Sequence, residues 1–462
     1  MTSPKQQITV ISGDGIGQEV VDATIKILEA ASTPIQFDHC QAGERIFKQG
    51  NSTGVPEETL ASIKKSKVVL KGPLTTPVGY GERSANVYLR KYFGLYANIR
   101  PVKQYPNIPS IYKDVPIDLV VIRENIEDLY AGIEYYHQPG IAQSIKLVTQ
   151  YGCDHINAFA FEYAKRTKRA SLHCATKANI LKTTEGMMKK SFEHMSSSYD
   201  DVKAHHIIID NCAHQLVVNP SQFDMIVTTN MNGDIISDLT SGLVGGLGIA
   251  PSANIGNDVA MFEAVHGAAP DIAGQNIANP TAMILSAVMM LRYIEMGAIA
   301  DTIEQALAVT FEQGKFTKDL NRDNGLSTDQ FTAAVIQNLG KSSSSFKSSV
   351  FKPVQLPEIK PPKTTKGVCF GVDIIIISNE PFDQLSERLN TIGIAEGFKP
   401  VVLSNRGKKV TMPEEHQIIP QWFCRFESNQ DVLRTHQITN LINKVSNDYH
   451  WVQVEKLFKF ND

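Results

Sequence analysis

Short runs of apolar residues alternate with helical segments through the first 340 residues of the chain. The first run, Ile8–Ile11, leads into a glycine-rich turn and a helix that we expect to end near Ala31. The same pattern predicts further buried strands at 67–70, 117–122, 170–173, 207–209 and 223–227, and periodic helices at 282–297 and 301–313. This alternation predicts an α/β architecture around a largely parallel sheet.

The pattern changes after residue 340. Residues 341–366 are rich first in serine and lysine and then in proline and lysine, which is typical of a linker that is flexible and then stiffer. Beyond this linker, the order β-α-β-β-α-β is predicted from strands at 367–377, 399–404, 422–427 and 450–460 and helices at 381–395 and 430–447. This order matches the ferredoxin-like motif, so we expect a small α+β domain at 367–462.

Composition and charge narrow the class of protein. Hydrophobic residues make up 42% of the 462 positions, and Lys plus Arg total 45 against 48 for Asp plus Glu. These values exclude a disordered or fibrous chain, and the near-neutral charge disfavours a nucleic-acid binder. Apolar runs are too short to span a bilayer, and Met1–Gln7 is too short for a signal segment. We therefore expect a cytoplasmic protein, with the mitochondrial matrix as the alternative.

The glycine-rich turn at Gly13–Gly17 invites comparison with dinucleotide-binding loops, with Asp38 at the ribose position. Its spacing, however, is G-x-G-x-G, and it lacks the third glycine that lets the helix pack closely on the strand. The sequence therefore does not predict a Rossmann site at this turn.

Charged and amide side chains follow four of the predicted strands, and ligands of open α/β sheets bind where carboxyl ends of strands meet. Asp234 and Asp238 are four residues apart at the start of a helix, so both carboxylates share one face. With a third Asp they would form an all-oxygen site suited to Mg²⁺ or Mn²⁺. Arg90, Arg100 and Arg123 suggest recognition of a small polycarboxylate. Helix capping and surface ion pairs are the competing explanations for any one of these residues.

Several segments of the chain resemble the isocitrate dehydrogenases, and together they span roughly residues 8–340. The similarity lies in residues 71–79, 83–90, 123–132, 232–238, 248–251 and 263–267. The wider superfamily includes isopropylmalate, homoisocitrate and tartrate dehydrogenases, which share the turn at Gly13–Gly17 and the Asp pair. The pair Ser84 and Asn86 favours the isocitrate members, because these use it to hold the γ-carboxylate of the substrate.

The resemblance implies the oxidative decarboxylation of isocitrate to 2-oxoglutarate in the tricarboxylic acid cycle. It implies that Ser84 and Asn86 bind the γ-carboxylate, while the three arginines hold the other two carboxylates. It further implies that Lys177 helps to remove the hydroxyl proton and that Tyr130 protonates the enol. The implied ligands of the metal are Asp210, Asp234 and Asp238.

The family pattern also implies a homodimer with shared active sites, because Lys177 and Asp210 act in the site of the other subunit. The implied fold is not Rossmann: a large domain comprises about 1–95 and 251–340, and a small dimerising domain comprises about 96–250. Together they form a core of residues 1–340.

The residues that the resemblance assigns to the cofactor are Thr75, His266, Gly267, Asp271, Ile272 and Asn279. Asp271 favours NAD, because a carboxylate accepts hydrogen bonds from a free ribose 2′-hydroxyl and repels a 2′-phosphate. Lys318 and Arg322 fall where NADP enzymes contact that phosphate, so NADP is the alternative. On balance the sequence predicts NAD.

The C-terminal segment resembles the extra domain of longer bacterial isocitrate dehydrogenases, and we expect it to act in subunit association. A regulatory ligand module is the alternative for this domain. For the whole chain, the competing functions are a dehydrogenase of homoisocitrate or isopropylmalate, a non-catalytic regulatory subunit, and RNA binding through the C-terminal domain. The catalytic residues disfavour the second of these, and the few basic features disfavour the third.

Overall fold

The computed structural model describes residues 5–77, 83–112, 115–354, 356, 358–361, 363, 365–411, 419–430 and 432–460. The chain forms two compact units, one from residues 1–135 and 143–361 and the other from residues 136–142 and 362–462. The hairpin β6 (Glu134–Gln138) and β7 (Ile141–Ser144) is therefore divided between them. Among the described residues, none of the helices has both the length and the apolar character that a membrane crossing requires.

The first unit is built on a ten-stranded sheet with the order β2-β1-β3-β12-β11-β4-β5-β10-β8-β9. Its strands are β1 (Gln6–Ile11), β2 (Ile35–Cys40), β3 (Val68–Lys71), β4 (Ala97–Lys103), β5 (Asp118–Glu124), β8 (Ser171–Thr176), β9 (Lys203–Ile208), β10 (Met225–Thr228), β11 (Pro251–Ile255) and β12 (Ala260–Ala264). The expected α/β architecture is confirmed, and both outer parts of the sheet are parallel.

The centre of this sheet is antiparallel, which the apolar pattern did not predict. β11 pairs antiparallel with β12 and β4, and β4 pairs antiparallel with β5. Because three reversals separate β12 from β5, the two parallel parts of the sheet run in opposite directions. Their carboxyl ends therefore do not meet at one edge.

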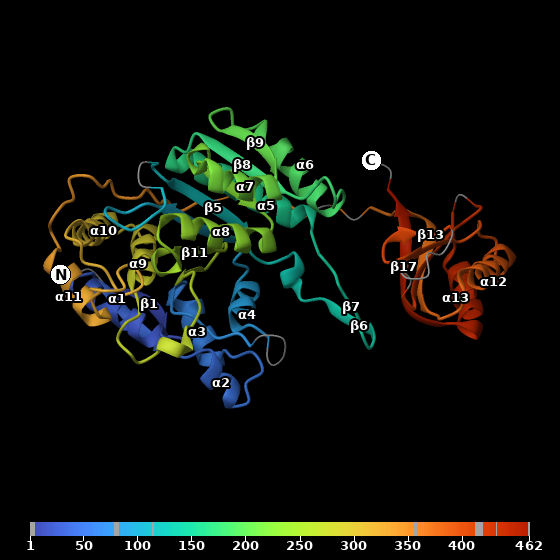
Figure 1. The fold of residues 1–462 in the computed structure, drawn as a ribbon, viewed down its shortest axis with the longest axis horizontal. Helices are drawn as coiled ribbons and strands as arrows, with labels where there is room; N and C mark the ends of the chain where they lie inside the picture. The colour runs from blue at the N-terminus through green and yellow to red at the C-terminus, as the bar shows by residue number, and fades with distance from the viewer. Residues whose placement is uncertain are drawn as a thin grey trace. The chain divides into compact units, whose positions relative to one another are not determined.

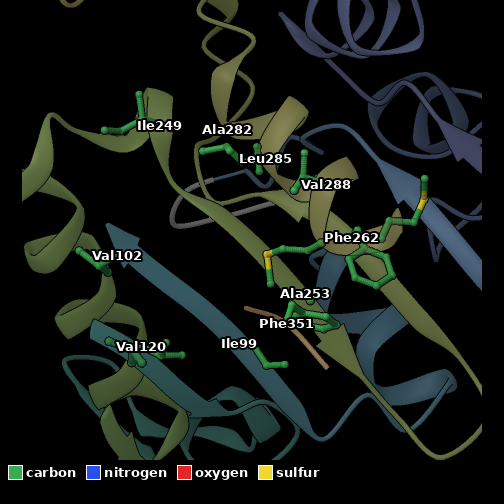
Figure 2. Close-up of a cluster of buried hydrophobic side chains, with 14 of the residues drawn as sticks. Ile99, Val102, Val120, Ile249, Ala253, Phe262, Ala282, Leu285, Val288 and Phe351 are labelled. Atoms are coloured by element: carbon green, nitrogen blue, oxygen red, sulfur yellow. The ribbon is translucent and has the colours of Figure 1, made fainter. Parts of the chain in front are cut away.

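Helices cover both parts of the sheet (Figure 1). The helices of the first unit are α1 (Gly17–Ala30), α2 (Glu44–Lys48), α3 (Glu57–Ser66), α4 (Ala85–Tyr92), α5 (Gln150–Thr167), α6 (Thr184–Ser196), α7 (Ile209–Val218), α8 (Asn230–Val244), α9 (Thr281–Tyr293), α10 (Gly297–Glu312) and α11 (Thr328–Gln337). Helix α9 is apolar on all sides and is buried from Thr281 to Arg292, and it packs against β11 and β12. It is the central helix of the hydrophobic core shown in Figure 2.

The start of the expected linker is not free but packs on the first unit, so the flexibility predicted for it is wrong. Phe346 and Phe351 are buried with 8% and 7% exposure. Phe346 stacks on Tyr105 with ring centroids 4.6 Å apart, and Ser349 donates a hydrogen bond of 2.6 Å to Glu304. Two aromatic residues inside a serine-rich stretch are enough to anchor it, and we refer to residues 346–351 as the strap.

The C-terminal unit has the predicted ferredoxin-like arrangement. Its sheet has the order β15-β14-β16-β13-β17, and the part of the unit that the structure describes contains two helices. The elements are β13 (Val368–Ile377), α12 (Phe382–Ala395), β14 (Val402–Asn405), β15 (Lys408–Lys409), β16 (Gln421–Glu427), α13 (Thr435–Asp448) and β17 (His450–Lys459). A separate core around Trp422, Phe426 and Leu441 holds this unit together.

Candidate active site

The polar side chains of the antiparallel centre lie on one face of the sheet. Side chains alternate along a strand, and direct partners in neighbouring strands share a face. The pairings join Asn98 to Arg123, Asn98 to Asn254, Ser252 to Glu263, and Glu263 to Lys71. This polar face is formed by Lys71, Asn98, Arg100, Arg123, Ser252, Asn254 and Glu263. The site therefore lies on a sheet face, rather than at the common carboxyl edge that we predicted.

Arg123 and Asp234 form the centre of the site. The Arg123 guanidinium is 1% exposed and lies 2.5 Å from Asp234, and the Tyr130 hydroxyl donates a 2.5 Å hydrogen bond to the other carboxylate oxygen. Burial lowers the pKa of Arg123 to about 9, an effect that neighbouring Arg100 strengthens. Burial would raise the pKa of Asp234, but the charges of Arg123 and Arg100 outweigh it and hold that pKa below its usual value.

Helix α8 can reach this position only because residue 233 is glycine. A Cβ at Gly233 would lie 2.6 Å from Cγ of Arg123. The absence of a side chain therefore lets α8 pack directly over the buried arginine and places Asp234, the next residue, on its guanidinium.

Arg100 connects the sheet to the second carboxylate of α8. Its guanidinium donates hydrogen bonds of 2.6 Å to Asn98 and 2.5 Å to Ser237. It also lies 3.3 Å from Asp234 and 3.5 Å from Asp238. Burial raises the pKa of Asp238, and Arg100 only partly opposes this shift.

Asp234 and Asp238 fit one part of a divalent-cation site. They give two carboxylates on one helix face, with side chains 35% and 52% exposed, and hard cations prefer such oxygen ligands. The described residues contain no group of three or more His, Cys, Asp or Glu side chains that could hold a metal within one chain. Asp210 instead forms a 2.8 Å ion pair with Lys177 in an exposed position, and this pair lowers the pKa of Asp210.

A buried ion-pair network lies beside the arginines, and sequence reasoning missed it. Glu263 is bound by Lys71 at 2.6 Å and by Arg90 at 3.0 Å, and Asn254 donates a 2.8 Å hydrogen bond to it. Burial would raise the pKa of Glu263, but Lys71 and Arg90 together hold it far below its usual value. A glutamate and an asparagine at inward positions of otherwise apolar strands were the available signal.

A small cavity of about 100 Å³ lies between this network and the loop that follows β12, where it is lined by His266 and Gly267. Three buried polar atoms on its lining residues, Oδ1 of Asn86, Nε of Arg90 and Nε2 of His266, have no hydrogen-bond partner among the described residues. Buried polar groups are almost always paired, so the three atoms indicate a polar ligand. The side chain of Ser84 caps α4 by accepting from the amide of Val87.

The glycine-rich turn holds neighbouring loops together. Gly15 has a φ of 54°, and a Cβ there would lie 1.9 Å from the carbonyl oxygen of Ala268. The Asp14 carboxylate accepts hydrogen bonds from the amides of Thr75 and Glu44 at 2.8 Å and 3.0 Å. The turn therefore fixes Thr75 and the 266–268 loop, two of the segments assigned to the cofactor.

The remaining cofactor residues lie on the loop that follows β12. His266 and Gly267 line the small cavity, whereas Asp271 and Ile272 belong to a short turn on which Asp271 is exposed. Asn279 donates a hydrogen bond of 2.9 Å to Asp319. This bond ties the loop to the segment that carries Lys318 and Arg322.

The chain is similar along almost its whole length to proteins of known sequence and structure. The chain is 49% identical over 468 residues to "Isocitrate dehydrogenase [NADP]" of Thermus thermophilus, covering 99% of this chain and 94% of the relative. It is 38% identical over 480 residues to the protein of the same name from Rickettsia bellii, covering 98% and 96%. A crystal structure of the TT0538 protein from Thermus thermophilus matches with a TM-score of 0.96 and 49% identity, covering 100% of this chain and 95% of that one.

The prediction of NAD is wrong, because the near full-length relatives are named NADP enzymes. The sequence argument gave Asp271 more weight than Lys318 and Arg322. In the structure the side chains of Asp271, Lys318 and Arg322 are all exposed, so burial gives the carboxylate no greater weight than the two cations. The segment with the two cations is tied to the same loop through the bond between Asn279 and Asp319.

The family comparison agrees with the fold. The family described as isocitrate/isopropylmalate dehydrogenase matches residues 7–335, and the bacterial isocitrate dehydrogenase C-terminal domain matches residues 368–462. The ten-stranded sheet, the buried arginines and the paired aspartates lie within the first of these matches. The chain therefore belongs to the isocitrate dehydrogenase family and carries its bacterial C-terminal domain.

Proposed function

We propose that the protein oxidises isocitrate with NADP and releases carbon dioxide and 2-oxoglutarate. The observation that carries this proposal is the group of Arg90, Arg100 and Arg123 beside Asp234 and Asp238. Lys71, Arg90, Arg100 and Arg123 outnumber the carboxylates Asp234, Asp238 and Glu263 by one positive charge. A tricarboxylate bound together with a divalent cation carries one net negative charge and would balance it. Asn86 and Ser84 at the start of α4 would bind the third carboxylate.

The proton transfers are assigned to two residues of the chain. Lys177, from the second subunit, would accept the hydroxyl proton as hydride leaves C2 for the nicotinamide. After the C–C bond to the departing carboxylate breaks, Tyr130 would donate its phenolic proton to the enol carbon. Burial and the hydrogen bond to Asp234 raise the pKa of Tyr130, so the proton is held in place at neutral pH.

Asp234 and Asp238 would hold Mg²⁺ or Mn²⁺, with Asp210 of the second subunit as a further ligand. When bound, such a cation polarises the substrate hydroxyl and stabilises negative charge on the enolate. The charges of Arg100 and Arg123 keep Asp234 ionised and ready to bind a cation.

A homodimer with shared sites is part of the proposal. Lys177 and Asp210 pair with one another, with side chains 35% and 68% exposed, and among the described residues Asp210 forms no carboxylate cluster with Asp234 and Asp238. Nearby elements expose large apolar side chains, as expected of a surface that a second subunit covers. These are Ile180, Val217, Val218 and Ile235, with exposures of 67%, 47%, 63% and 61%.

Lys318 and Arg322 would bind the 2′-phosphate of NADP. Both side chains are exposed, and their segment is held against the cofactor loop by Asp319. Two cations can pair with a phosphate that carries nearly two negative charges.

For the C-terminal unit we propose a role in subunit association. This unit is compact, has its own core, and includes residues 136–142 of the β6–β7 hairpin. A chain ending at residue 361 keeps the buried strap and tests this role. A lower mass in solution supports association, and an unchanged mass with unchanged thermal stability contradicts it.

The substrate assignment is tested by initial rates of NADPH formation with isocitrate, homoisocitrate and isopropylmalate in the presence of Mg²⁺. We expect isocitrate to be preferred, and we expect activity to be lost with a chelator and restored by added cation. In the double variant Ser84→Ala/Asn86→Leu the preference should shift away from isocitrate. Equal rates with isopropylmalate, or no effect of the double variant, would contradict the assignment.

A further inference from the structure

A second and larger cavity lies on the opposite face of the central sheet. Its volume is about 330 Å³, which is in the range of small-molecule sites. Its apolar wall comes from Leu285, Val288 and Met289 of α9 and from Phe351 of the strap. Figure 2 shows Phe351 beside Ile99 of β4 and Ala253 of β11.

The two cavities share strands β4 and β11. Along β4, Arg100 borders the small cavity of the active site, and the next residue, Pro101, borders the large one. Along β11, Ser252 and Pro251 are divided in the same way. Successive residues of a strand point to opposite faces, so a shift of either strand in the large cavity moves a substrate-binding side chain.

Positively charged side chains outnumber negatively charged ones around the large cavity. Its lining contains the cations Lys103, Lys168, Arg169, Arg292 and Lys347 and the carboxylates Asp118, Asp224 and Glu304. All three carboxylates are already paired with the two arginines, at 2.5 Å, 2.8 Å and 2.7 Å. The lysines are therefore the cations left for a ligand.

Lys103 is the most informative of these lysines. Its ammonium lies 4.2 Å from the ring centroid of Phe346 and donates a 2.5 Å hydrogen bond to the carbonyl of Lys347. Among the described residues it has no carboxylate within ion-pair distance, and burial lowers its pKa. A partly buried ammonium that has the charges of Glu304 and Asp118 nearby but no direct ion pair, next to an apolar wall, fits an anion that carries an apolar body.

We infer that this cavity is a binding site for a small organic anion with an apolar body, and that its occupation changes the affinity for isocitrate through β4 and β11. Lys103 would pair with the anionic group, and α9 and Phe351 would contact the apolar part. The binding itself is independent of the proposed reaction, whereas the coupling rests on the proposed substrate.

Binding is tested on the full-length protein with 4-(trifluoromethyl)benzoate as the probe, followed by ¹⁹F NMR, and with the neutral 4-(trifluoromethyl)benzyl alcohol for comparison. We expect the benzoate to bind in the presence of saturating NADP and isocitrate. Lys103→Met should weaken it by about tenfold, since a hydrogen bond to a charged group is lost. The matched control Lys190→Met, an exposed lysine on α6, should bind like the wild type.

The variant Val288→Phe fills the cavity and leaves every charged residue in place. It should therefore abolish binding of the benzoate. No binding to the wild type at millimolar probe, equal binding in Lys103→Met, or simple competition, in which the apparent Kd of the probe rises without limit as isocitrate or NADP is increased, would each overturn the site. For the coupling, calorimetric titration of isocitrate with and without probe should differ several-fold, and equal affinities would overturn it. An inactive enzyme that still binds the probe would contradict the proposed function alone.

Discussion

Asn254 donates a hydrogen bond of 2.8 Å to the buried carboxylate of Glu263, and this contact connects two arginines of the active site. On one side, Glu263 binds Arg90. On the other, the side-chain carbonyl of Asn254 accepts a 2.9 Å hydrogen bond from Asn98, which in turn accepts one of 2.6 Å from Arg100. The positions of the two guanidiniums are therefore linked through the sheet face.

Asn254→Ala should disturb both arginines at once. We expect the KM for isocitrate to rise about tenfold with a smaller change in kcat, and the free energy of unfolding to fall by about 1–3 kcal/mol, because buried partners lose their bonds. Asn157→Ala is the matched control: Asn157 is equally buried and bonds Ser191 on α6. It should lose similar stability with no change in KM. An unchanged KM in Asn254→Ala contradicts the linkage.

Glu263→Gln should lower the free energy of unfolding by about 3–5 kcal/mol at neutral pH, because Lys71 and Arg90 lose their buried counter-charge. The pKa of Glu263 is depressed in the folded protein, so its contribution is fully present above the ordinary carboxyl pKa and is lost as the pH falls through the folded value. Chemical denaturation at several pH values should show a constant difference from wild type between pH 8 and 5 and a smaller one below about pH 4.

The control for this experiment is Glu44→Gln, which breaks the exposed 2.6 Å pair with Lys48. We expect a far smaller change from this control, because water screens the exposed pair. A Glu263→Gln protein as stable as wild type at pH 7 would show that the network is not strongly stabilising.

Tyr130→Phe removes the proposed proton donor and leaves the ring over Arg123. We expect kcat to fall by about 10²–10⁴-fold with isocitrate binding retained. Since burial and Asp234 raise the pKa of Tyr130, this residue should not produce an alkaline limb in the wild-type kcat profile below pH 10. Tyr199→Phe, which loses a similar 3.0 Å bond to Glu162 outside the site, should keep normal kcat. Normal turnover by Tyr130→Phe would remove the residue from the mechanism.

Shared active sites predict complementation between two inactive variants. Lys177→Met and Tyr130→Phe should each be nearly inactive alone. After co-expression or subunit exchange, each heterodimer contains one intact site, so a random mixture should regain about a quarter of wild-type activity. Recovery is measured as NADPH formation after mixing. If no activity returns although heterodimers are present by mass spectrometry, Lys177 and Tyr130 act in the same chain's site.

Much of the fold could be predicted from apolar runs. The strands at Gln6–Ile11 and Val368–Ile377 and the helix at Phe382–Ala395 lie within a few residues of the predicted ranges. The antiparallel centre could not be predicted, because β4 contains Asn98, Arg100 and Lys103 and lacks a continuous apolar run. Strand direction also depends on pairing between distant segments, which local periodicity does not contain.

The site was predictable where a residue type has one evident use, as for the Asp pair on α8. Glu263 and Asn254 left only one signal in the sequence, their position in otherwise apolar strands, because their partners come together only once β11 and β12 pair with β4 and β3. The strap was mistaken for a free linker because its serines dominate the composition, while two phenylalanines determine its packing. The cofactor prediction was wrong because Asp271 was considered by itself. The hydrogen bond between Asn279 and Asp319 joins its loop to a segment that carries two cations.

The most direct test of the account is a parallel measurement of kcat/KM for NADP and NAD with isocitrate and Mg²⁺. We predict rapid formation of 2-oxoglutarate and a strong preference for NADP, and a shift of at least about tenfold toward NAD in the variant Lys318→Ala/Arg322→Ala, which loses two charged contacts to the phosphate. Preference for NAD by the wild-type enzyme would contradict the cofactor assignment. Absence of activity with both cofactors would contradict the proposed function itself.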